Sequence, residues 1–279
     1  MGYVGYLNKM TIEHAGQAKQ ETEKAIILAV ETSSRIGSAA LAAGPILLEE
    51  RTFSGPMRHS SELFPALVDL LEGHRFAPTD LGQIHISIGP GSFTGLRIAV
   101  ALAKTMYLAH GVRIITVDSL DVVAANLADA NHQPAVPSRI AALFDAKRGQ
   151  FYASVYDRDA AAPATDQDTE KQGTDYRIPA PHNGLWKKIA PDGLMTAQEI
   201  LAGFAGSERI GLLGDGLLYH RDKFDPDRVV ILPERTWSPH ARNVHHLGYQ
   251  KACAGRFADP LALVPFYLRG PEVTLRRNP

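Results

Sequence analysis

A glycine-rich segment follows an apolar stretch at residues 84–88 and could hold a phosphate group. The segment reads Gly89-Pro90-Gly91-Ser92-Phe93-Thr94-Gly95 and opens a long apolar run. Backbone N–H groups at a helix start favour anions, so a phosphate site is compatible with this strand–loop–helix pattern. The nucleotide-binding P-loop, however, needs a lysine followed by serine or threonine, and here Leu96 follows Gly95. A tight structural turn is the favoured interpretation.

A polar turn at residues 31–37 lies between two expected strands and is rich in hydroxyl side chains. Hydroxyls in such a turn could contact phosphate, although a plain polar hairpin turn explains the composition better. As a secondary hypothesis, a phosphate or nucleotide contact is assigned to residues of both segments. They are Thr32, Ser33, Gly89, Gly91 and Ser92.

The histidines do not form a recognisable metal motif. His240, His245 and His246 are close in sequence, but spacings of one and five do not place side chains on one helix face. His59 has Leu63 four residues later, and catalytic zinc normally needs three protein ligands. The Gly-x-Ser-x-Gly pattern of a serine nucleophile is absent as well. We expect neither a metal site nor a catalytic residue.

Two expected helices, residues 60–74 and 93–110, are apolar around most of their circumference. Their apolar arcs span roughly 200° and roughly 240°, whereas a stripe of roughly 100° suffices for a helix that covers a core on one side. One explanation is burial inside a layered fold; the favoured one is a protein–protein interface. The predicted interface residues are His59, Leu63, Leu67, Leu70, Leu71, Leu96, Val100, Ala103, Met106 and Tyr107.

Composition and charge point to an ordinary globular protein. The 279 residues are 45% hydrophobic and 21% charged, with a net charge of -1, so nothing global indicates a nucleic-acid or membrane protein. The single cysteine, Cys253, excludes an internal disulfide framework and fits a reducing compartment. No apolar run reaches the roughly 18–20 residues that cross a bilayer. We expect a cytoplasmic protein with no membrane contact.

The order of expected elements predicts two similar α/β halves. Three strands joined by tight turns precede alternating helices and strands in residues 25–130, which is the order of a ribonuclease-H-like domain with a mixed sheet. After a proline-containing linker at 131–138 the pattern restarts. We expect a flexible extension at 1–24, a first half at 25–130 and a second half at 131–279, with an insertion near 157–184.

Five segments, in this order along the chain, resemble the TsaB family. They are Ile27–Ser33, His59–Leu63, Gly89–Arg97, Asp145–Gly149 and Pro265–Arg269. The resemblance covers about residues 25–269, and the glycine-rich motif is its most specific part. Residues 1–24 and 157–184 depart from the family pattern.

The resemblance implies an actin-like (ASKHA) fold made of two ribonuclease-H-like halves. It also implies a non-catalytic scaffold that binds the catalytic subunit TsaD, with the ATPase TsaE joining the complex. That complex transfers threonylcarbamoyl to the adenosine next to the anticodon of tRNAs that read codons beginning with A. The chain would contact tRNA through the complex and form a homodimer when alone. It would have no cofactor of its own, with ATP or ADP at the complex interface.

The sequence departs from the catalytic relative at two places. Ser119 and Val123 stand where that enzyme has its two metal-binding histidines, and Ser34, Arg35 and Ile36 replace the residues after its first Glu-Thr-Ser. Two alternatives stay open at this point. One is a metal-dependent carbamoyltransferase or glycoprotease-like enzyme of the same fold. The other is a small-molecule kinase-like ATPase that uses the turn at 214–216.

Overall fold

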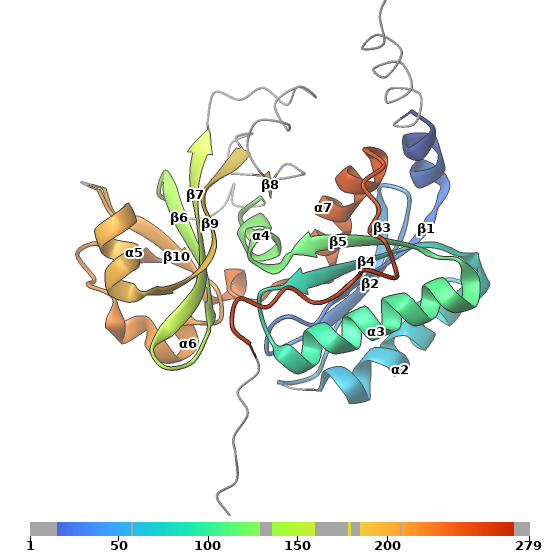
Figure 1. Cartoon of the computed structure of the whole chain (residues 1–279), viewed down its shortest axis with the longest axis horizontal. Coiled ribbons are helices and arrows are strands. Elements are labelled where there is room, and N and C mark those ends of the chain that lie inside the picture. Colours follow the sequence, from blue (N-terminus) through green and yellow to red (C-terminus); the bar gives the residue numbers. More distant parts are fainter. Residues whose placement is uncertain are drawn as a thin grey trace, which may run out of the picture.

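Two mixed β-sheets lie side by side in the computed structural model, which describes residues 16–56, 58–128, 136–159, 178–179, 185–206 and 208–270 (Figure 1). The first sheet has the strand order β3-β2-β1-β4-β5 and the second the order β11-β10-β6-β7-β9-β8. The first contains β1 (Ile26–Glu31), β2 (Ser38–Ala43), β3 (Ile46–Thr52), β4 (Leu81–Gly89) and β5 (Arg113–Asp118). The second contains β6 (Arg139–Asp145), β7 (Gln150–Asp159), β8 (Ile178–Pro179), β9 (Leu185–Thr196), β10 (Ile210–Leu213) and β11 (Val229–Ile231).

The two sheets repeat one topology. In the first, β1 pairs antiparallel with β2, β2 pairs antiparallel with β3, and β4 and β5 add in parallel on the other side of β1. In the second, β6, β7 and β9 form the antiparallel part, while β10 and β11 add in parallel beside β6. This arrangement confirms the expected actin-like fold of two ribonuclease-H-like halves.

Helices cover both faces of the first sheet. The helices of the first half are α2 (His59–Gly73), α3 (Phe93–His110) and α7 (Ala241–Cys253), α4 (Ser119–Ala124) lies between the two sheets, and α5 (Ala197–Phe204) and α6 (Leu217–His220) pack on the second sheet, with short 3₁₀ turns at Pro78–Asp80, Ala125–Leu127, Arg221–Lys223 and Glu234–Thr236. Leu28 and Val30 of β1 pack into the core under α2 and α3, whereas Ala29 between them packs into the core that contains α7. The period-two alternation of a strand therefore separates the two helical layers.

Helix α7 returns to the first half. It contacts β1, β2, β4 and β5, although the sequence pattern placed all of 131–279 in the second half. Its start is fixed by first-half side chains: the N–H of Ala241 donates to Ser38 Oγ at 2.8 Å, and the N–H of Arg242 donates to Glu50 Oε1 at 3.1 Å. Because these acceptors lie about 200 positions away in the sequence, local capping rules do not identify them.

Part of the expected N-terminal extension packs against the first half. Residues 16–24 form a helix, and Thr22 is fully buried, where its Oγ1 accepts a hydrogen bond from Gln83 Nε2 at 3.0 Å. Arg113 and Glu21 form an ion pair at 3.0 Å. Residues 1–15 and most of the predicted insertion at 157–184 lie outside the described part of the chain. Strand β9 begins at Leu185, directly after that insertion.

Other boundaries differ less. Helix α2 begins at His59 with Arg58 as its N-cap residue, so Ser60 and Ser61 do not cap it. Helix α3 spans the predicted residues, with Ser92 Oγ accepting the N–H of Gly95 and Gly111 in the left-handed conformation at its end. Among the described strands and α-helices, β8, β9 and α6 are the ones that the sequence pattern did not predict.

Two buried histidines lie between β4 and α7. The rings of His85 and His245 stack with centroids 6.0 Å apart and 14° between their planes. His85 Nε2 bonds Gln83 Oε1 at 3.0 Å. Burial lowers the pKa of both rings, that of His245 to about 4 from an ordinary 6.5. The pair is therefore packed as two neutral imidazoles.

Acid should destabilise the wild-type chain relative to His245→Gln. As the pH falls from about 6.5 to about 4, the unfolded chain binds a proton that folded His245 resists. We therefore expect the wild type to lose roughly 3 kcal/mol of unfolding free energy relative to the variant across this range. Urea unfolding at several pH values measures the difference. His110→Gln, at an exposed helix end, controls for the loss of an imidazole. Parallel pH curves for the wild type and His245→Gln would contradict the assignment.

Candidate functional site

The glycine-rich loop packs directly against the polar turn after β1. A Cβ atom on Gly91 would lie 2.2 Å from the carbonyl oxygen of Ser33, and one on Gly95 would lie 1.8 Å from that of Thr32. The N–H of Ser92 donates to the carbonyl oxygen of Ser33 at 2.6 Å. The glycines are needed because two backbones approach more closely than any side chain allows.

We call the place where the glycine-rich loop meets the turn after β1 the junction. Its hydroxyl groups already have partners within the chain. Thr32 Oγ1 donates to the carbonyl oxygen of Gly95 at 2.8 Å, and Ser33 donates from both its N–H and its Oγ to Glu31 Oε1 at 2.5 Å. Ser87 Oγ donates to the other carboxylate oxygen. Glu31 is fully buried, and this burial raises its pKa in spite of the hydrogen bonds from Ser33 and Ser87.

The predicted phosphate contacts are therefore corrected. Thr32 and Ser33 are buried and bonded within the turn, and Gly91 and Ser92 contact the same turn. Gly89 has a φ of 128°, and a Cβ there would lie 2.3 Å from the carbonyl oxygen of Phe266. The pattern resembled a phosphate cradle because a close backbone contact demands the same residue type as a close phosphate contact.

The turn at 214–216 also packs so closely against another backbone segment that Gly214 has no room for a side chain. A Cβ on Gly214 would lie 2.1 Å from the carbonyl oxygen of Leu143. Asp215 Oδ2 accepts the N–H of Arg35 at 3.4 Å, and the guanidinium of Arg35 bonds the hydroxyl of Tyr219. Burial raises the pKa of Asp215 to about 6. The residues that a kinase-like ATPase would use here hold the two halves together instead.

A buried lysine ties the halves on the other side of the junction. Lys188 of β9 places its Nζ 2.8 Å from Asp121 Oδ1, 2.8 Å from Asp192 Oδ1 and 3.6 Å from Asp118 Oδ2. The hydroxyl of Tyr156 donates to Asp121 Oδ1 at 2.5 Å. Although burial lowers the pKa of Lys188, the three carboxylates raise it above its ordinary value.

Sequence reasoning missed this cluster, because its members come from three separate elements. Asp118 ends β5 and Asp121 lies in α4, where the resemblance locates the two histidines of the catalytic relative. Burial and the neighbouring Asp121 raise the pKa of Asp118 to about 6. The positive charge among Asp118, Asp121 and Asp192 is the ammonium group of Lys188. The described residues contain no group of three His, Cys, Asp or Glu side chains that could hold a metal ion.

The candidate histidines have structural roles. His59 Nε2 lies 2.9 Å from the carbonyl oxygen of Ser34. Ser119 Oγ accepts the N–H of Gly89 at 3.2 Å, and Val123 is fully buried.

Most of the predicted interface residues belong to the chain's own core, which corrects that prediction. The buried ones are His59, Leu63, Leu67, Leu70, Leu71, Leu96, Val100 and Ala103. Met106 is half-buried and Tyr107 is 37% exposed. The broad apolar arcs arise because α2 and α3 each contact the sheet and also each other. A periodicity argument does not distinguish a neighbouring helix from a partner protein.

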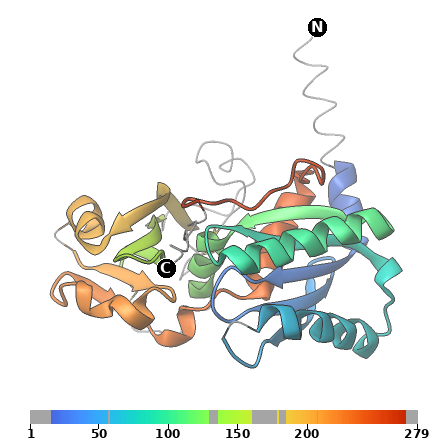
Figure 2. The ribbon, with the colours of Figure 1, turned by 60° about the horizontal axis from the view of Figure 1, so that its bottom comes forward.

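The same two helices nevertheless expose apolar side chains to solvent. Phe64 and Val68 of α2 are 57% and 51% exposed, and Leu108 of α3 is 76% exposed. Ala101 and Thr105 are exposed on α3, about two turns and one turn before Leu108, respectively. We call these five residues the docking face. Figure 2 shows α2 and α3 next to each other on the outside of the first half.

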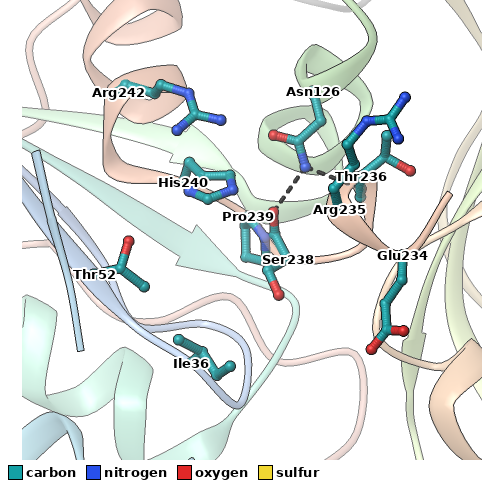
Figure 3. A pocket seen from close by; sticks show the side chains of 10 residues that line it. All are labelled: Ile36, Thr52, Asn126, Glu234, Arg235, Thr236, Ser238, Pro239, His240 and Arg242. Atoms are coloured by element: carbon teal, nitrogen blue, oxygen red, sulfur yellow. Dashed lines mark hydrogen bonds between the residues drawn. The ribbon is translucent and has the colours of Figure 1, made fainter. Parts of the chain in front are cut away.

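A cavity of about 550 Å³ opens where the halves meet beside α7 (Figure 3). Asn126 donates to the carbonyl oxygens of Thr236 and Ser238 at 3.0 and 2.7 Å. Arg242 forms an ion pair with Glu50 at 2.7 Å. Although burial raises the pKa of Glu50, the nearby imidazole of His240, the hydrogen bond from the N–H of Arg242 and the charge of its guanidinium lower it to about 2. The size suits a small ligand, but several of its polar groups are already engaged.

Comparisons with known proteins agree with this fold and junction. The family model described as "TsaD: tRNA N6-adenosine threonylcarbamoyltransferase" matches residues 55–203. The Bacillus subtilis "tRNA threonylcarbamoyladenosine biosynthesis protein TsaB" is 30% identical over 248 residues, which cover 87% of this chain and 93% of that protein. The Escherichia coli protein of the same name is 31% identical over 104 residues, or 37% of this chain and 43% of that protein. The solved structure "YeaZ from Pseudomonas aeruginosa" has a TM-score of 0.66 at 22% identity, covering 88% of this chain and 100% of that one.

Fold and junction together define an actin-like α/β protein related to the threonylcarbamoyltransferase TsaD. Within that class, the chain belongs to the TsaB family of tRNA threonylcarbamoyladenosine biosynthesis proteins. In the part of the chain that the structure describes, no helix is both long and apolar enough to cross a membrane.

Replacing the buried lysine should destabilise the fold. In Lys188→Met the carboxylates of Asp121 and Asp192 lose the buried cation between them, and removing one partner of a buried pair costs roughly 3–5 kcal/mol. Urea unfolding measures the change. Lys187→Met, at the exposed neighbouring position, is the matched control and should change stability by about 0.5 kcal/mol at most. Equal stability of the two variants would show that Lys188 does not hold the cluster.

Proposed function

We propose that the chain is a non-catalytic scaffold subunit that binds TsaD through the docking face. In that complex TsaD transfers threonylcarbamoyl to the adenosine next to the anticodon of tRNAs that read codons beginning with A. TsaE joins the complex, and ATP or ADP binds at the complex interface and not to this chain alone. The protein works in the cytoplasm, where its tRNA substrates are.

The observation that carries the proposal is the exposed apolar surface of α2 and α3. Phe64, Val68 and Leu108 are large apolar side chains that are each more than half exposed. Large apolar side chains exposed on neighbouring helices favour a protein interaction site, and an aromatic side chain such as Phe64 would contribute much of the binding energy once a partner buries it. Alone, the chain forms a homodimer through the same face.

The non-catalytic role rests on the junction. The turn after β1 and the glycine-rich loop close on each other, and Lys188 lies among the aspartates near the place where the catalytic relative binds its metal. Both features favour a structural role for the region that is catalytic in TsaD.

Charge introduced on the docking face should separate the complex. In Phe64→Asp or Val68→Asp, binding TsaD would bury an unpaired carboxylate, which costs several kcal/mol and corresponds to an affinity loss of about 100-fold or more. Co-purification with tagged TsaD measures binding, and gel filtration of the isolated chain measures the dimer.

Ile231→Asp is the matched control, because Ile231 is 40% exposed on β11 of the second half. It should bind TsaD like the wild type. Circular dichroism establishes that each variant is folded. The docking proposal is wrong if folded Phe64→Asp and Val68→Asp both retain TsaD at the wild-type level.

A further inference from the structure

The C-terminal segment lies across both halves and places two arginines along one edge. The N–H of Phe266 donates to the carbonyl oxygen of Ile88 at 2.8 Å. The ring of Tyr267 lies 4.9 Å from that of Phe93 at the start of α3, and Arg97 Nε donates to the Tyr267 hydroxyl at 3.2 Å. Two residues later, Arg269 donates to the carbonyl oxygen of Ala146 and to Gln150 Oε1. Figure 1 shows this segment in red, passing from the first half towards the second.

The β6–β7 turn at the end of this segment carries further cations. Lys147 and Arg148 are exposed, and both adopt the left-handed conformation, with φ of 63° and 55°. Hairpin turns of this conformation favour asparagine and glycine, so two long cationic side chains are not explained by the turn itself. Lys223 lies against the same turn, because its Nζ would be 2.9 Å from a Cβ on Gly149.

We call these cations the basic rim: Arg97, Lys147, Arg148, Lys223 and Arg269. Asp145 and Asp215 beside it are largely withdrawn from solvent, whereas Asp222, next to Lys223, is exposed. Asp145 has a side chain that is only 12% exposed and is bonded to Lys147, whose own side chain is 78% exposed. Asp215 is 7% exposed. Since the whole chain has a net charge of -1, the rim is a local excess of positive charge.

We propose that the basic rim binds the phosphate backbone of RNA. The inference rests on the proposed function, in which the substrate of the complex is a tRNA. Arginine and lysine side chains along an edge bind nucleic acid by releasing counterions from the phosphates, without reading sequence. The guanidinium of Arg97 lies over the Phe93 ring, 3.7 Å from its centroid, and this contact holds the cation at the rim.

Neutralising the turn should weaken RNA binding and its salt dependence. Lys147→Asn/Arg148→Asn removes two charges with residues that tolerate the left-handed conformation. We expect the affinity of the TsaD complex for an unmodified tRNA to fall about ten-fold or more near physiological salt. The slope of log K against log salt should become shallower by about 2, one for each lost phosphate contact. Fluorescence anisotropy at several salt concentrations measures both quantities.

Lys19→Gln/Lys24→Gln is the control, because it removes two exposed cations from the N-terminal helix, far from the rim (Figure 1). It should leave affinity and slope unchanged. An unchanged affinity in the turn variant, or an equal loss in the control, would overturn the proposal. So would competition by polyglutamate as strong as that by RNA at equal charge, because the rim would then suit an acidic protein segment.

Co-purification separates this inference from the docking proposal. The Lys147→Asn/Arg148→Asn variant should retain TsaD while losing tRNA affinity. This result would support the RNA site and a TsaD contact that lies away from the β6–β7 turn. If Phe64→Asp retains TsaD while the turn variant of the isolated chain still loses tRNA affinity, the docking proposal fails and the RNA site stands. If the turn variant retains TsaD and wild-type tRNA affinity, the RNA site alone fails.

Discussion

The close approach of the glycine-rich loop to the turn after β1 is the constraint on which the rest of the first half depends. Because Gly91 and Gly95 lack side chains, the carbonyl oxygens of Thr32 and Ser33 come within ordinary contact of the loop backbone. This contact fixes the start of α3, and α3 in turn presents Ala101, Thr105 and Leu108 beside α2. The motif that is most specific to the family thus acts through backbone geometry and positions a helix surface some distance away.

The alternating pattern and turn chemistry of the sequence were sufficient to predict the fold class and most elements. Helix α3, for example, runs from Phe93 to His110 as expected, because an N-cap serine and a terminal glycine act within one helical turn. Contacts between residues far apart in the sequence could not be predicted from it. Ser38 and Glu50 fix the start of α7 from across the fold, and no local rule contains them.

The candidate site shows the same limit. Leu63 and Ala103 were correctly predicted to be buried. Burial against the chain's own sheet, however, gives the same sequence pattern as burial against a partner protein. Exposure in the structure is what separates Phe64 and Val68 from them. The Lys188 cluster was missed for another reason: its charges come from β5, α4 and β9, and their proximity is a property of the sheet order.

Helix α7 has a consequence for the order in which the chain can fold. One face of the first sheet is covered by residues 241–253, which are synthesised after all the described strands of both sheets. Until they emerge from the ribosome, the α7-facing side of β1 and β2 has no partner layer, although every strand of that sheet is already present. The nascent first half is therefore an incomplete domain that exposes apolar surface, and residues 25–130 are not a unit that could be separated and expected to fold alone.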